Sequence, residues 1–350
     1  MNKAVRLALV AGLALSLPMQ AKAGTIVGGV DALKEWNLIV LGNVSSSSEV
    51  EGRTFIGGDL SGNSSNYTIG SSAGVPVPPA VAGVNAPGLT VVGNVSGGTK
   101  NLNNGSGATV GGNVSSGFNL NGPNQTVLVG GSISNTNVNS NTVKSGQSAV
   151  DGFIQGLVDQ KTALASSLTQ LSKTLSNLVV TDTASFANNT ATFNVGTTGT
   201  KLSVFDISAS QLASANQIQF NLNSADTVIV NVSGSNINLF QNFLGNSNNL
   251  GQNVIWNFED ASKFTSNVAW HGSVLAPTAD ATTYNYIQGS AVFASLIQNG
   301  EVHLNTYAGS FTPGAAPEPT SWALMIVGFG AVGAALRRRR TARAGQLAAA

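Results

Sequence analysis

Val110-Gly111-Gly112-Asn113-Val114 recurs in the next stretch of the chain as Val129-Gly130-Gly131-Ser132-Ile133, and this repeated phrase decides the fold. It consists of an aliphatic residue, one or two glycines, a small polar residue and a second aliphatic residue. The phrase also occurs at Leu41-Gly42-Asn43-Val44, Ile56-Gly57-Gly58-Asp59-Leu60 and Val92-Gly93-Asn94-Val95. Counted at the last glycine of each phrase, the steps along the sequence are 16, 35, 19 and 19. A period of this length, with one turn and one short strand per repeat, is typical of a β-solenoid.

The physical basis of the repeat is the stacking of coils. Aliphatic side chains of each coil pack on those of the coils above and below. Glycine at a corner permits a tight turn with positive φ, and Asn or Asp tolerates the left-handed conformation. Hairpins of a β-sandwich are an alternative, because turn signals also recur there, at a shorter interval. The longer spacing and the recurrence of the phrase itself favour the solenoid.

A change in the spacing of apolar residues predicts one long helix at about residues 148–179. Its apolar residues follow helical spacing, so they form one stripe that we expect to dock on the flank of the solenoid. Ser148 is the candidate N-cap, and Gly152 and Gly156 weaken the first turns. A coiled-coil or membrane-surface helix is disfavoured, because the polar face is rich in Ser, Thr and Gln. The stripe consists of Val150, Phe153, Ile154, Leu157, Leu164, Leu168, Leu171, Leu175 and Leu178.

Strand-like segments resume after the helix. A related phrase, aliphatic or aromatic residues around Gly-Ser, occurs at 270–275 and 287–292 with a step of 17, and we expect a last rung at 299–304. The fold class predicted is therefore mainly β, a β-solenoid with one long amphipathic α-helix packed alongside. Further strands are predicted at 191–195, 217–222, 227–232 and 254–258.

The N-terminus is typical of a secretory signal peptide. Lys3 and Arg6 precede the apolar stretch 7–17, and Ala21 and Ala23 form a small-x-small cleavage site. We therefore expect residues 1–23 to be removed and the body to work outside the cytoplasm.

The C-terminus has three parts: Pro317-Glu318-Pro319, the apolar run 322–336, and the block Arg337, Arg338, Arg339 and Arg340. Fifteen residues of helix span roughly 22 Å, short of a ~30 Å hydrocarbon core unless the arginines extend it. The block would hold its end on the cytoplasmic side. The order resembles the PEP-CTERM sorting signal, which implies processing by an exosortase-like membrane enzyme. The prediction is a tail at 313–350 with a transmembrane segment at 322–336.

Charge and cysteine content exclude several classes of protein. Eight of the 16 Lys and Arg residues lie in the two ends, leaving eight against 14 acidic residues, so the body carries a charge of about −6. This removes the electrostatic support for nucleic-acid binding. The chain has no cysteine, which excludes disulfides, thiolate metal sites and cysteine nucleophiles.

Phrases near both ends of the body resemble a known family. Residues 37–44 and 50–59, and later 270–280 and 299–303, are similar to the choice-of-anchor A domain, over roughly residues 36–307 of this chain. That resemblance implies an adhesin that carries an exchangeable C-terminal anchor, a β-solenoid beside a long helix, and no catalytic residues. We therefore assign residues 24–312 to one adhesin domain.

Two groups of residues are candidates for chemical sites. A carboxylate pair for polysaccharide cleavage could come from Glu49 and Glu51, with Asp59 nearby, as in β-helical hydrolases and lyases. The body has few aromatic and basic residues to line a groove, so Glu51 and Arg53 are interpreted as a local ion pair.

The two histidines form the second group. His271 and His303, with Glu301 on the same face of a strand and Asp280 near, could hold a metal. Two histidines in the whole chain supply little for such a site. We therefore predict no catalytic, cofactor or metal site.

Together these features predict an exported bacterial cell-surface or matrix protein, an adhesin or a structural protein of exopolysaccharide and biofilm. Its expected partners are signal peptidase, an exosortase-like enzyme, and exopolysaccharide or a neighbouring cell surface, with no nucleic acid. The alternative is a polysaccharide-degrading β-helix enzyme.

Overall fold

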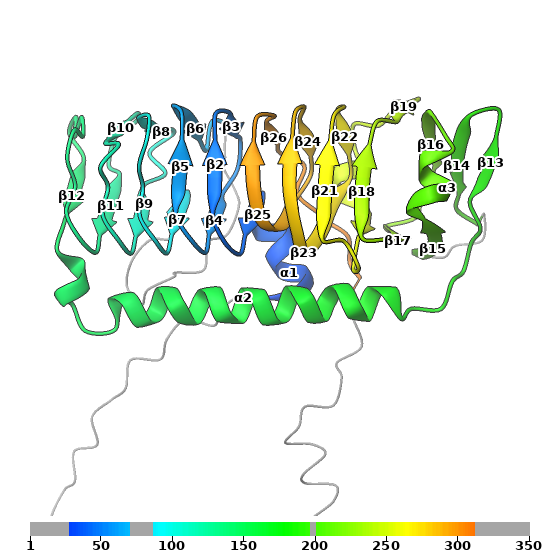
Figure 1. Cartoon of the computed structure of the whole chain (residues 1–350), viewed down its shortest axis with the longest axis horizontal. Coiled ribbons are helices and arrows are strands. Elements are labelled where there is room, and N and C mark those ends of the chain that lie inside the picture. The colour runs from blue at the N-terminus through cyan, green and yellow to red at the C-terminus, as the bar shows by residue number, and fades with distance from the viewer. Residues whose placement is uncertain (1–27, 71–86, 197–200, 312–350) are drawn as a thin grey trace, which may run out of the picture. The chain divides into compact units, whose positions relative to one another are not determined.

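The first strand of the chain lies in the middle of a long parallel sheet (Figure 1). The structure, a computed structural model, describes residues 28–70, 87–196 and 201–311. The expected signal peptide at 1–23, with Ala21 and Ala23, lies outside these residues, as does the expected tail at 313–350. The described residues up to Gly309 form one compact unit, to which the description below applies.

Three sides of parallel strands enclose the core. The first side is one sheet in which strands distant in sequence are neighbours. Its order is β12 (Thr142–Lys144), β11 (Thr126–Val129), β9 (Ala108–Val110), β7 (Leu89–Val91), β4 (Thr54–Ile56), β1 (Leu38–Val40), β25 (Ala291–Gln298), β23 (Ser273–Thr283), β20 (Val254–Asn257), β17 (Thr227–Ser233) and β15 (Leu202–Ser208).

The second side is built from short strands and from the second halves of β23 and β25, which bend from one side onto the next. Single bridges at Val95, Val114 and Ile133 continue it. Its named strands are β2 (Val44–Ser46), β5 (Leu60–Gly62), β18 (Asn236–Leu239) and β21 (Lys263–Ser266).

The third side has two parts. Its seven-stranded sheet runs β10 (Phe118–Leu120), β8 (Lys100–Leu102), β6 (Ser65–Tyr67), β3 (Glu49–Val50), β26 (Val302–His303), β24 (Ile287–Gln288) and β22 (Trp270–His271). Its four-stranded sheet runs β13 (Ser185–Ala187), β14 (Thr190–Asn194), β16 (Gln217–Asn221) and β19 (Asn242–Leu244), with only β13 antiparallel to its neighbour.

The coils are not stacked in sequence order. From β1 the chain coils outward to β12, and helix α2 (Phe153–Ser176) then carries it along the stack to the opposite end (Figure 1). From β15 it coils back until β25 pairs with β1 and β26 pairs with β3. The two halves meet at a central seam between the first and last coils, so the rung predicted at 299–304 lies beside the first rung.

The glycines of the repeated phrase are required for space rather than for positive φ. Gly58, Gly112 and Gly131 do not have positive φ, but a Cβ on any of them would meet the Asn Oδ1 of the preceding coil. That oxygen is occupied in turn by the backbone N–H that follows the glycine. The resulting corner ladder is Asp59 N to Asn43 Oδ1 (2.9 Å), Asn94 N to Asp59 Oδ1 (2.7 Å), Asn113 N to Asn94 Oδ1 (2.9 Å) and Ser132 N to Asn113 Oδ1 (2.8 Å).

Helix α2 docks its leucines on the first side, as predicted, but Val150 and Ile154 of the predicted stripe are exposed. Leu157, Leu164, Leu168 and Leu175 are fully buried, and α2 contacts β17, β20 and β23. The expected bounds of 148–179 are too wide. The N-cap is Gly152 in the left-handed conformation, not Ser148, because Gly152 turns the chain out of a 3-10 helix (Gln147–Ala149).

The remaining helices are short. Helix α1 (Gly29–Glu35) packs beside α2, and α3 (Ala209–Ala213) begins with a capping box formed by Ser208 and Gln211. Helix α4 (Leu250–Asn253) leads into β20. None of these three was predicted from the sequence.

The parallel pairing of all strands but β13 confirms the solenoid and rejects the β-sandwich alternative. The predicted strands at 191–195, 217–222, 227–232 and 254–258 correspond to β14, β16, β17 and β20. Strand β15 was missed. The long step between Gly58 and Gly93 holds a single coil, because β4 pairs directly with β7, and residues 71–86 between these coils are not described.

The expectation of a transmembrane protein is contradicted. Across 28–70, 87–196 and 201–311, no helix combines the length and apolar character needed to cross a membrane. The segment 322–336, on which that expectation depended, lies outside the described residues.

Candidate functional site

Three turns lie side by side where the second and third sides meet near the seam. They join β23 to β24, β25 to β26, and β2 to β3, and their strands are paired. The turns line a shallow pocket of about 190 Å³. Its lining residues are Ser48, Tyr284, Asn285, Tyr286, Asn299, Gly300 and Glu301.

Two aromatic side chains, Tyr284 and Tyr286, line this pocket. Tyr286 stacks on His303, with ring centroids 4.4 Å apart and an interplanar angle of 8°. The Tyr286 hydroxyl lies 3.4 Å from Nε2 of His271, whose Nδ1 is 2.8 Å from Gln288 Oε1. Tyr284 projects into solvent with 59% of its surface exposed. We call Tyr284, Tyr286 and His303 the Tyr–His platform.

Three carboxylates lie near the platform, on or next to strand β3 and in the turn before its paired strand β26. Glu301 Oε2 lies 2.6 Å from His303 Nε2. On the adjacent strand, Glu49 Oε1 accepts a 2.8 Å hydrogen bond from Asn66 Nδ2, and Glu51 Oε2 accepts a 2.6 Å bond from Leu304 N. The edge of the platform is therefore acidic.

Rows of amides continue from the platform along the third side. Asn119 Nδ2 donates to Asn101 Oδ1 at 3.0 Å, and Asn121 Nδ2 donates to Asn103 Oδ1 at 2.9 Å. Neighbouring members of a row lie about one strand spacing apart, ~4.8 Å. These rows present regularly spaced donors and acceptors to solvent.

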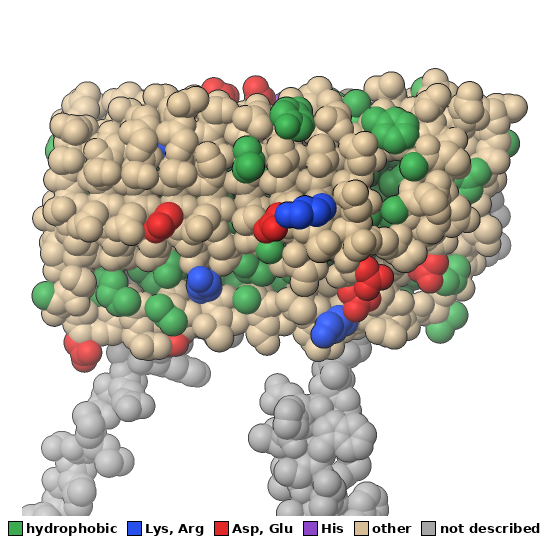
Figure 2. Space-filling view, in the orientation of Figure 1, with side chains coloured by type: hydrophobic (Ala, Val, Ile, Leu, Met, Phe, Trp, Pro, Cys, Tyr) green, Lys and Arg blue, Asp and Glu red, His purple; other side chains and the backbone are tan. Residues whose placement is uncertain are grey.

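The second side is also polar and largely uncharged. Figure 2 shows a surface dominated by uncharged polar side chains and backbone, with few charged groups. One row of mostly short hydroxyl side chains crosses it in strand register, consisting of Ser61, Ser45, Ile297, Thr282, Thr265 and Asn238.

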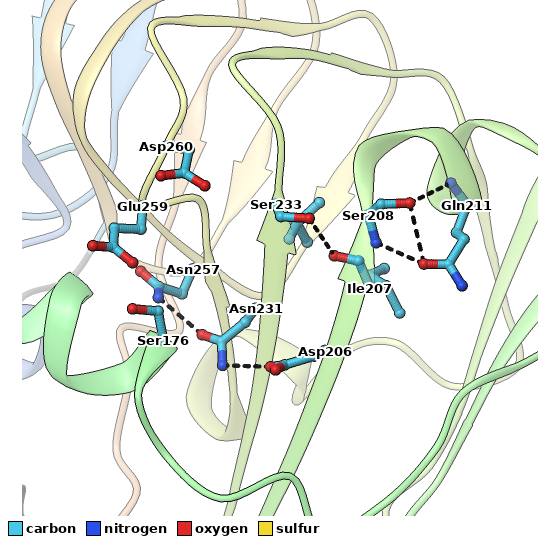
Figure 3. A pocket seen from close by; sticks show the side chains of 11 residues that line it. Ser176, Asp206, Ile207, Ser208, Gln211, Asn231, Ser233, Asn257, Glu259 and Asp260 are labelled. Atoms are coloured by element: carbon cyan, nitrogen blue, oxygen red, sulfur yellow. Dashed lines mark hydrogen bonds between the residues drawn. The ribbon is translucent and has the colours of Figure 1, made fainter.

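A second hollow, of about 290 Å³, lies where α2 ends (Figure 3). Asp206, Asn231 and Asn257 stand in register on β15, β17 and β20. Asn257 Nδ2 donates to Asn231 Oδ1 (2.9 Å), and Asn231 Nδ2 donates to Asp206 Oδ1 (2.8 Å) and Leu175 O (3.0 Å). We call this row the amide latch, because it ties the last turn of α2 to the sheet.

The structure separates the residues considered for a metal. His271 and His303 both flank Tyr286, but Asp280 lies in a different sheet, 3.0 Å from Lys263 Nζ. Burial lowers the pKa of His271. Within the described part of the chain, no cluster of three or more His, Asp or Glu side chains is arranged to hold a metal ion.

The carboxylates considered for catalysis do not share one site either. Glu49 and Glu51 flank Val50 on the third side, whereas Asp59 is a member of the corner ladder. Burial lowers the pKa of Arg53 to about 10, and the nearby Glu35 opposes that shift. Its guanidinium lies 5.7 Å from the Trp36 ring centroid.

The Tyr–His platform was not predicted from the sequence. Tyr284 and Tyr286 flank a single Asn in a short turn. They lie outside the repeated Gly-Ser motif from which the neighbouring strands were predicted. The available signal was two tyrosines separated by one residue in a polar turn.

The fold defines a parallel β-solenoid split by a helix. Residues 29–304 match the family described as "Putative Ice-binding-like adhesive domain", and the chain belongs to that family. Residues 315–340 match the PEP-CTERM protein-sorting motif, which implies an exosortase-type processing partner. The predicted resemblance to an adhesin domain with a PEP-CTERM tail is confirmed. The protein is thus an exported, surface-associated protein with an adhesive domain, and that domain points to a non-enzymatic role.

Similarity to a solved structure is weak. The crystal structure of an ice binding protein from an Antarctic bacterium, Flavobacteriaceae, shares 12% identity and a TM-score of 0.22, over 82% of this chain and 84% of that one. No curated protein matches the chain.

Proposed function

We propose that this protein is a non-enzymatic adhesin that holds polysaccharide of the bacterial surface or biofilm matrix at the Tyr–His platform. The observation that carries the proposal is the exposed ring of Tyr284 beside the stacked Tyr286 and His303. A flat aromatic ring packs well against the apolar face of a sugar ring, and its neighbours can hydrogen-bond the hydroxyl groups.

The amide rows support binding of a polymer rather than a single sugar. They extend from the platform over several coils, so successive sugar units could each find a weak contact. Linked weak contacts add up to useful avidity. The pocket itself is shallow, which favours binding along a surface over turnover in a cleft.

Processing of both ends completes the proposal. Signal peptidase would cut after Ala23, within the Ala21–Ala23 site, and leave a body of about residues 24–312. An exosortase-type membrane enzyme would act on the tail 313–350 near Pro317-Glu318-Pro319, with Arg337 to Arg340 marking its end. Mass spectrometry of the exported protein, from cells with and without the processing enzyme, tests this. A retained arginine block would reject it.

Retention on immobilised exopolysaccharide tests the adhesive role. We expect the full chain to be retained and Tyr284→Ala to bind about tenfold more weakly, because it removes the exposed ring. Tyr284→Phe keeps the ring and should bind normally. Ile297→Ala is the matched control, since it removes exposed apolar surface from the second side.

The same incubation separates an adhesin from an enzyme. Retention without new reducing ends or unsaturated products supports the adhesin. Release of such products would reject the non-enzymatic role, and equal binding by Tyr284→Ala would reject this site.

A further inference from the structure

We infer that the polymer held at the Tyr–His platform carries free amino groups, as in a partly deacetylated amino-sugar polysaccharide. The inference rests on the proposed function and names its ligand class. It is carried by the position of three carboxylates around an aromatic surface that projects into solvent.

The three carboxylates are neighbours across the seam. Val50 and Val302 are register partners in the paired strands β3 and β26. Glu49 and Glu301 therefore flank the same position on adjacent strands, about one strand spacing apart, and Glu51 lies beside His303. Each residue is next to an inward-facing valine, so each side chain is on the outer face.

Neutral donors or a histidine hold these carboxylates. Glu49 is bonded to an asparagine amide, Glu51 to a backbone N–H, and Glu301 to His303. The two lysine–carboxylate ion pairs found among the described residues, Lys34–Asp31 and Lys263–Asp280, lie elsewhere. None of the three carboxylates is in a lysine ion pair, so three acidic side chains border the platform.

Negative charge selects among polysaccharides. An ammonium group about 4 Å from a carboxylate gains ~1 kcal/mol even at the dielectric constant of water, and a uronate is repelled by a similar amount. The tyrosine rings supply a second attraction for a cation. N-acetylation removes that charge, so a fully acetylated polymer would keep only the stacking and hydrogen bonds.

The test uses the full chain and three polymers of matched length: a fully N-acetylated glucosamine polymer, a partly deacetylated one and a polyuronate. At low salt we expect the partly deacetylated polymer to bind about tenfold more tightly than the acetylated one, and the polyuronate to bind least. Added salt should reduce the difference in affinity between the partly deacetylated and the acetylated polymer, because salt screens exposed charges.

Variants that each remove one carboxylate show which residues produce the preference for the amine-bearing polymer. Glu49→Gln keeps the acceptor for Asn66 and should reduce the preference for the amine-bearing polymer two- to fivefold, about 0.4 to 1 kcal/mol. Asp59→Asn is the matched control, because it removes one carboxylate from the corner ladder, where Asn43 and Asn94 already stand. It should leave the preference unchanged.

The outcomes separate the two proposals. Equal, Tyr284-dependent binding of acetylated and deacetylated polymers would overturn the amine inference and leave the adhesive role standing. Tightest binding of the polyuronate would also overturn it. Binding of none of the three, with retention on native exopolysaccharide intact, rejects only the ligand class. Loss of both rejects the adhesive role as well.

Discussion

The side-chain amide of Asn37 donates a 2.8 Å hydrogen bond to the carbonyl oxygen of Gly289, from the opposite end of the domain's sequence. The same nitrogen donates to His303 O at 2.8 Å, and Asn37 Oδ1 accepts from Gly52 N at 2.9 Å. Asn37 is fully buried. One side chain therefore joins the first coil to the last two and closes the central seam.

Replacing Asn37 should weaken the whole domain. Asn37→Ala leaves buried carbonyl and N–H groups without this partner, and we expect a loss of about 3 kcal/mol in the free energy of unfolding. Urea denaturation measures it. Asn238→Ala, an exposed asparagine of the second side, should change stability by less than ~0.5 kcal/mol. Similar losses for the two variants would contradict the role given to Asn37.

The corner ladder makes a prediction about glycine. Gly112→Ala should lower the free energy of unfolding by about 1 to 3 kcal/mol, because the added Cβ meets Asn94 Oδ1 and the backbone oxygen of Gly93. Gly196→Ala is the control, since its Cβ would lie 3.4 Å from Asp182 Oδ1, an ordinary contact. Thermal melting of both proteins checks the difference, and a neutral Gly112→Ala would refute the crowding argument.

The amide latch should hold the end of α2. Asn257 donates to Ser172 O at 2.9 Å and accepts from Ser172 Oγ at 2.6 Å, both inside the interface. Asn257→Ala is expected to cost about 1 to 3 kcal/mol and to speed amide hydrogen exchange in the last turns of α2. Exchange that rose evenly along the whole helix would not support a local latch.

Lys100 should make stability depend on alkaline pH. Its side chain is fully buried and Nζ donates to Asn63 O at 2.5 Å, while burial lowers its pKa from 10.5 to about 8. Between these two values the unfolded chain binds more protons than the folded one. Stability should therefore rise from pH 8 toward pH 10, with a slope of at most about 1.4 kcal/mol per pH unit.

The lysine variant isolates that effect. Lys100→Met removes the titrating group, so the rise between pH 8 and 9.5 in urea denaturation should disappear. Above pH 10 the buried Tyr67, whose pKa burial raises to about 12, opposes the rise because the unfolded chain ionises first. A rise that persists in Lys100→Met would show that another group is responsible.

The sequence was sufficient for the kind of fold and for the helix. The regular spacing of the glycine motif reflects the length of one coil. The spacing of the leucines from Leu157 to Leu175 reflects a helix with one buried face. Both signals are local and periodic, which is what a sequence can show.

The order of the coils could not be predicted. Ile39 pairs with both Phe55 and Val292, and nothing in their identities distinguishes a neighbour on the next coil from one at the far end of the chain. Strand β15 was missed because it carries none of the repeated phrase. The platform was missed because Tyr286 and His303 come from different coils, and their stacking depends on the pairing of β24 with β26.

The seam also sets when the body can finish folding. An exported chain emerges with its N-terminus first, and its opening coil presents an unsatisfied edge until Ala291 and Val302 arrive. The early coils can stack on one another. The open edge of the first coil stays unpaired until almost the entire domain has been synthesised and exported. The solenoid can therefore be completed only after the whole adhesive domain has been translocated.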